Sequence, residues 1–73
     1  MKPYAIFADK FHNYAIVEER TCRPYYGAPK QKCYRVILQD YEGFTYHISV
    51  HETATDAMEK LKSFSCGSWQ EVA

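Results

Sequence analysis

The chain of 73 residues has little that would mark it as secreted or membrane-bound. Its three cysteines, Cys22, Cys33 and Cys66, are odd in number and form no Cys-x-x-Cys pair, so they predict neither a disulfide framework nor a zinc ribbon. The apolar run Tyr4 to Ala8 is far too short for a signal peptide or a membrane span. We therefore expect a cytoplasmic protein with reduced, half-buried thiols and no membrane partner.

The motifs of common enzyme chemistry are also missing: there is no Gly-x-Ser-x-Gly, P-loop, His-Glu-x-x-His or dinucleotide fingerprint. His47 and His51 are four residues apart, but on a strand that spacing separates them by about 13 Å, too far to share a metal ion. A zinc site would need one of them to recruit His12 and a distant cysteine. Ser49 is two residues from each histidine, which predicts about 7 Å and no hydrogen bond. We expect solvent-facing histidines, and no metal, cofactor or enzyme activity.

The composition predicts one small folded domain, residues 1–73. Hydrophobic residues make up 47% and charged residues 25%, which is typical of a soluble globular protein. A chain of this length buries only about 60% of the surface that its unfolded form exposes. Little apolar area remains for a deep substrate pocket, which also favours a protein that is not an enzyme.

Residues 44–64 carry the clearest structural pattern. Apolar residues first alternate with polar ones, which predicts a strand whose buried face consists of Phe44, Tyr46, Ile48 and Val50. Apolar residues then recur at helical spacing, at Ala54, Ala57, Met58, Leu61 and Phe64. Thr53 is placed to cap this helix, with Asp56 three residues later. We expect the strand's apolar face to pack against the helix, which should end near Ser65.

The other segments complete the predicted fold. Strand-like runs at 4–8 and 14–19 are separated by a turn at 9–13, and both faces of this hairpin carry apolar residues. Cys33 to Gln39 predicts a third strand, followed by a type I turn at 40–43 that Gly43 closes in the left-handed region. Residues 68–72 fit a short last strand with Trp69 as an anchor. The prediction is an α+β fold: a small antiparallel sheet of four or five strands, built from two hairpins, with one C-terminal amphipathic helix on one face.

The charge distribution points to one candidate binding segment, residues 20–35. The nine basic and nine acidic residues balance overall, yet this segment has five basic residues and no acidic one. Pro24, Gly27 and Pro29 predict that residues 20–32 form a long loop. Exposed tyrosines beside arginine and lysine are typical of recognition surfaces. The candidate binding residues are Arg20, Arg23, Tyr25, Tyr26, Lys30, Lys32 and Arg35.

These observations favour a small non-enzymatic binding module that engages a macromolecular partner, most readily a protein, through this segment. A narrower form is a stand-alone inhibitor or an antitoxin-like protein of a mobile element. The alternative is a nucleic-acid-binding accessory protein, with the basic residues on phosphates and Tyr25 or Tyr26 stacked on bases. A homodimer through an exposed edge strand also stays open.

One short segment resembles a known family. Residues 53–61, with the sequence TATDAMEKL, are similar to the helix that follows the strands in small antitoxin domains of the HicB type. The likeness covers less than a fifth of the chain, and the long loop and second hairpin depart from that pattern. It implies a capped amphipathic helix, and no functional residue is carried over.

Overall fold

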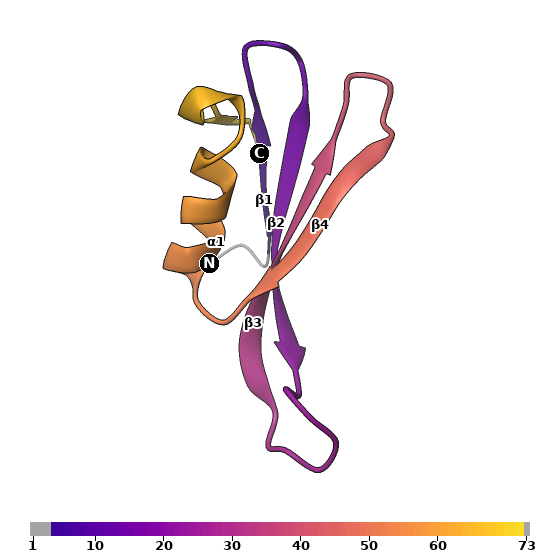
Figure 1. Cartoon of the computed structure of the whole chain (residues 1–73), viewed down its shortest axis with the longest axis vertical. Coiled ribbons are helices and arrows are strands. Elements are labelled where there is room, and N and C mark those ends of the chain that lie inside the picture. The colour runs from indigo at the N-terminus through magenta and orange to yellow at the C-terminus, as the bar shows by residue number, and fades with distance from the viewer. Residues whose placement is uncertain (1–3, 73) are drawn as a thin grey trace.

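The computed structural model describes residues 4–72, which form one antiparallel sheet and one α-helix (Figure 1). Neighbouring strands lie in the order β4-β3-β2-β1-β5. The elements are β1 (Tyr4–Ala8), β2 (Tyr14–Cys22), β3 (Gln31–Gln39), β4 (Thr45–His51), α1 (Ala54–Lys62), a 3-10 turn (Ser65–Gly67) and β5 (Gln70–Glu71). The predicted α+β class, with a single C-terminal helix, is confirmed. Within residues 4–72, α1 is neither long nor apolar enough to cross a membrane.

The turn between β1 and β2 is organised by Asp9, which is almost fully buried. Its Oδ1 accepts hydrogen bonds from the backbone N–H groups of Phe11 (2.8 Å) and Asn13 (2.9 Å). Its Oδ2 accepts from the Asn13 side chain at 3.0 Å and from the hydroxyl of Ser65, near the other end of the chain. Burial alone would raise the pKa of Asp9, but these hydrogen bonds outweigh it and lower the pKa below 3.8. Asp9 thus fastens the first turn to the C-terminal segment.

The second turn and the helix start follow the predicted chemistry. Gly43 has φ of 91°, and its N–H donates to the carbonyl of Asp40 at 2.9 Å, which confirms a turn closed in the left-handed region. The hydroxyl of Thr53 accepts from the N–H of Asp56 at 3.1 Å, which confirms the helix cap. The helix itself ends at Lys62, earlier than predicted, and a 3-10 turn takes the chain on to β5.

The core lies between α1 and one face of the sheet. Its buried members come from four elements and are Phe7, Ala15, Val36, Leu38, Ala57 and Leu61. Around them pack the partly buried residues Ala5, Val17, Tyr34, Met58, Phe64 and Trp69. Trp69 therefore anchors the C-terminal segment as predicted, whereas Ala54 is exposed and takes no part in the core.

The face of β4 that was predicted to be buried is the exposed one. The register pairs Leu38 with His47 and Val36 with Ser49, so the odd-numbered residues of β4 share a face with the buried residues of β3. The even-numbered apolar residues point away from α1 and are 49%, 59% and 60% exposed: Tyr46, Ile48 and Val50. Phe44 precedes the strand and is 67% exposed.

The reason is that β4 is an edge strand, and its pairing with β3 decides which of its side chains point toward α1. Only residues 52 and 53 separate β4 from α1, and α1 folds back over both β3 and β4. The helix covers the face on which Val36 and Leu38 lie, because the opposite face of β3 carries the polar residues Arg35 and Gln39. Alternation in β4 identifies two faces, but it does not decide which one the helix covers.

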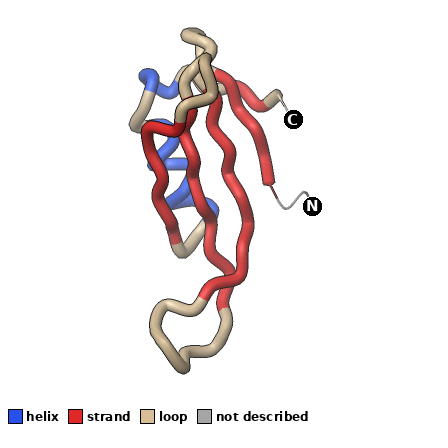
Figure 2. The backbone as a smooth tube through the Cα atoms, turned by 90° about the vertical axis from the view of Figure 1, so that its right-hand side faces the viewer, coloured by secondary structure: helices blue, strands red, loops and turns tan. Residues whose placement is uncertain are grey.

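The hairpin of β2 and β3 is longer than predicted. Both strands continue beyond the expected ends, so that β2 reaches Cys22 and β3 begins at Gln31, and the connecting loop is only 23–30. The prediction that regular structure stops from 20 to 32 is therefore wrong. The hairpin extends well past the N-terminal end of α1 (Figures 1 and 2). It contributes to a long molecule of 42 × 24 × 19 Å.

Candidate functional site

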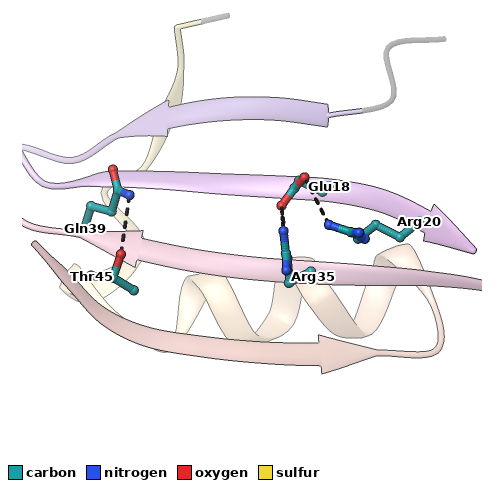
Figure 3. A network of polar contacts seen from close by, with 5 residues as sticks. All are labelled: Glu18, Arg20, Arg35, Gln39 and Thr45. Atoms are coloured by element: carbon teal, nitrogen blue, oxygen red, sulfur yellow. Dashed lines mark hydrogen bonds and ion pairs between the residues drawn. The ribbon is translucent and has the colours of Figure 1, made fainter. Parts of the chain in front are cut away.

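Three of the five basic residues of segment 20–35 have an acidic neighbour on β2. Arg35 donates to Glu18 Oε1 from Nε at 3.0 Å and from Nη2 at 2.7 Å, and Arg20 lies 3.8 Å from Glu18 Oε2 (Figure 3). Lys32 Nζ lies 3.3 Å from Glu19 Oε1. Both glutamates precede position 20, so the charge count over residues 20–35 did not include them. The two glutamates therefore offset part of the positive charge of segment 20–35, through one contact within β2 and contacts of Lys32 and Arg35 from β3 to β2.

The remaining two basic residues lie in the loop at the end of the hairpin, residues 23–30, which we call the tip. Arg23 and Lys30 are both exposed, and neither forms an ion pair with any residue of 4–72. Tyr25 is 69% exposed and Tyr26 is fully exposed, at 103%. The structure thus brings four of the seven predicted binding residues together, at the far end of the molecule.

The tip has a defined turn. The N–H of Ala28 donates to the carbonyl of Tyr25 at 3.1 Å, and Gly27 has φ of 85°, the value that a type II turn needs at its third position. Ala28 is only 4% exposed, so the last residue of this turn is shielded from solvent. Tyr26 is the second residue of this turn and projects into solvent.

Tyr34 lies apart from this surface. It is on the α1 side of β3 and packs against the core, whereas Arg35 and Arg20 lie on the opposite face of the sheet. The exposed aromatic groups of segment 20–35 are therefore Tyr25 and Tyr26 alone.

Ser49 and His51 form a hydrogen bond that the sequence reasoning excluded. Ser49 Oγ lies 2.8 Å from His51 Nε2, because both side chains lie on the same face of β4 and lean toward each other along the strand. The prediction from backbone spacing was wrong for this pair. Nucleophilic catalysis also requires a third group that orients the histidine, and within residues 4–72 no hydrogen bond reaches His51 Nδ1.

The histidines of β4 face the helix rather than solvent. His47 and His51 are only partly exposed, and the His47 ring lies 5.0 Å from the Phe64 ring at 49°. The prediction of solvent-facing histidines is wrong for His47 and His51, because the face of β4 was assigned the wrong way round, whereas His12 is exposed. Residues 4–72 contain no group of three or more histidine, cysteine, aspartate or glutamate side chains placed to hold a metal ion.

The three cysteines have different surroundings. Cys33 is buried, Cys22 is partly exposed and Cys66 is exposed, so the expectation of three half-buried thiols holds only for Cys22. Cys22 and Cys33 lie on neighbouring strands of the long hairpin. The neighbouring Cys33 thiol, together with burial, raises the pKa of Cys22.

A second exposed surface is the sheet face opposite α1, which we call the open face. It carries the alternate residues of β1 to β4 that do not contact the helix, among them Tyr4, Tyr14, Tyr46, Ile48 and Val50, which are 43–60% exposed. Partial burial of Tyr46 and the carboxylates of Asp9 and Asp40 raise the pKa of its phenol. The sequence indicated this surface only through the apolar residues on both faces of the first hairpin.

Comparison with known proteins assigns no role to either surface. The chain matches no protein-family model, no curated protein and no solved structure.

Proposed function

We propose that this protein is a non-enzymatic binding module that captures a protein partner through the tip. The observation that carries the proposal is the grouping of Tyr25, Tyr26, Arg23 and Lys30 on one projecting loop. The rest of the chain supplies the scaffold that holds this loop away from the core. A projecting turn of this kind fits a concave surface on the partner.

The chemistry of the tip suits a protein surface with an apolar pocket and acidic groups around it. Tyrosine and arginine are enriched among the residues that dominate binding energy at protein interfaces, because each combines a large contact area with polar groups. The turn at Gly27 orders the loop before binding, which reduces the entropy lost on association. Arg23 and Lys30 carry positive charge that β2 does not compensate, and this charge speeds association with an acidic partner.

Nucleic acid is the weaker alternative because only two of the five basic residues stay unpaired. Two phosphate contacts predict a slope of roughly −2 for log affinity against log salt concentration, which means weak binding at physiological salt. A gel-shift titration with single-stranded and duplex nucleic acid tests this alternative. Retarded bands at physiological salt, weakened by substitution of Tyr26, would favour nucleic acid over protein as the partner.

The charges of the tip provide a direct test. We expect the double variant Arg23→Glu/Lys30→Glu to lose its partner in affinity capture followed by mass spectrometry, because the reversed charges repel the acidic surface that the wild-type loop attracts. Circular dichroism should show an unchanged fold, since neither side chain forms an ion pair within residues 4–72.

The matched control is Lys10→Glu/Lys62→Glu, which changes the net charge equally at two exposed sites away from the tip. This control should retain the partner. Equal retention of the partner by the tip variant would exclude the tip as the binding site.

A further inference from the structure

The open face is crossed by a continuous row of four isoleucines. The register places Ile6 opposite Ile16, Ile16 opposite Ile37, and Ile37 opposite Ile48, so that each of four neighbouring strands contributes one. Solvent-facing sides of antiparallel sheets are commonly polar, whereas this one is apolar at its centre. In Figure 1 α1 lies against the other side of the sheet, and Ile48 remains 59% exposed. A contiguous apolar surface of this kind is typical of an interaction site.

The next row of the open face contains one complementary pair of charges. It runs Tyr4, Glu18, Arg35, Val50 from β1 to β4, and the two charged residues are joined by the hydrogen bonds seen in Figure 3. The row therefore has apolar side chains at both ends and one charge of each sign at its centre. Glu18 lies on β2 and Arg35 lies at the same level on β3.

We propose that two copies of this chain pack open face to open face, about a twofold axis that runs along the strands between β2 and β3. This rotation exchanges the positions of β2 and β3, so Glu18 of each copy lies over Arg35 of the other. It also places Ile16 over Ile37 and Ile6 over Ile48. The molecule that packs on the open face is a second copy of this chain, because this surface is complementary to itself in both charge and apolar character.

Burial of the charged pair in this dimer leaves no charge uncompensated. Arg35 already donates two hydrogen bonds to Glu18 within one copy, at 2.7 and 3.0 Å. In the dimer the two pairs form a group of four alternating charges, each next to two of opposite sign. Buried ion pairs are tolerated when every member keeps its partners, and they select a single register.

The size of the face predicts a weak dimer. Four strands about 4.8 Å apart and five residues rising about 3.3 Å each outline roughly 300 Å² per copy. Projecting side chains increase the area, but it stays below the standard interface of about 800 Å² per partner. We expect a dissociation constant in the micromolar range, with the two sheets about 10 Å apart.

Sedimentation velocity over a micromolar concentration series tests the dimer. We expect the mass of 8.6 kDa to rise toward about twice that value with concentration. Ile48→Thr should weaken association at least tenfold, because it places a hydroxyl in the apolar row while keeping a β-branched side chain that suits the strand. Phe11→Thr is the control, since Phe11 is equally exposed, at 59%, but lies in the β1–β2 turn. A monomer at every concentration would overturn the proposal.

The axis itself is tested with the charge-swapped double variant Glu18→Arg/Arg35→Glu. The swapped chain loses the exposed 3.8 Å contact between Glu18 and Arg20, but it retains the pair within each copy and across the twofold axis, so it should still self-associate. Mixed dimers of wild type and swapped chain would place like charges over each other at both sites. We therefore expect native mass spectrometry of the mixture to detect the two homodimers and almost no heterodimer. Free mixing would contradict this packing and would favour pairing through an edge strand instead.

Discussion

Leu38→Ala is expected to destabilise the protein by about 3 kcal/mol, whereas Ile48→Ala should cost less than about 1 kcal/mol. Leu38 is fully buried between β3 and α1, so its truncation leaves a cavity in a core with few large side chains. Ile48 is 59% exposed on the open face, so its truncation removes few contacts within one copy. Urea unfolding followed by circular dichroism measures both values, at concentrations below the range of dimer formation.

This pair of variants tests which face of β4 the helix covers. The alternation of β4 in the sequence favours Ile48 as a core residue, and in that arrangement its truncation would cost as much as that of Leu38. Equal losses for the two variants would contradict the fold described above.

Asp9→Ala is expected to destabilise the protein by about 2 kcal/mol. The substitution removes the acceptor of the hydrogen bonds from Phe11, Asn13 and Ser65, and a hydrogen bond to a charged group contributes more than a neutral one. Asp9→Asn is the conservative comparison, because its amide oxygen still accepts from the two backbone N–H groups. It should lose less stability than Asp9→Ala.

The pH dependence of this effect has a definite sign. The pKa of Asp9 is lowered in the folded protein, so the folded state gains stability from the charged carboxylate above pH 3.8. That gain disappears as the pH falls through the folded pKa of Asp9. The difference in unfolding free energy between the wild type and Asp9→Ala should therefore shrink below pH 3.8. If this difference in unfolding free energy stays constant below pH 3.8, the charge of Asp9 does not contribute to its stabilising effect.

Local chemistry made much of the fold predictable. The Asp9–Asn13 turn, the Asp40–Gly43 turn and the Thr53 cap each depend on side chains within a few residues, and each has the expected role. The sequence did not predict which face of β4 packs against the helix, because this depends on the pairing of His47 with Leu38. Strand alternation has the same period on both faces, so only long-range register can decide between them.

The candidate site was predictable in its location but not in its charge. Tyr25 and Tyr26 are exposed at the tip as expected, since Pro24 and Gly27 favour a turn there. The charge of segment 20–35 was overestimated, because Glu18 lies beside Arg20 on β2, and the pairing of β2 with β3 brings Lys32 and Arg35 close to Glu19 and Glu18. A count of charges within one segment does not include acidic residues outside it that the fold brings close.

The two proposals have a joint consequence. A twofold axis parallel to the strands leaves the β2–β3 hairpins of both copies pointing in the same direction. The dimer would then present two tips side by side, and simultaneous contact with a repetitive or dimeric partner would raise the apparent affinity without any new contact. Ile48→Thr should reduce this gain while leaving the affinity of a single tip unchanged.

The most direct test of the tip as the binding site is the affinity of the captured partner for Tyr26→Ala and Tyr41→Ala, measured by isothermal titration. Both tyrosines are highly exposed, at 103% and 71%, and they lie in turns at opposite ends of β3. We expect Tyr26→Ala to weaken binding about 30-fold, which corresponds to about 2 kcal/mol, and Tyr41→Ala to bind as the wild type does. Wild-type affinity in Tyr26→Ala would contradict the proposed function.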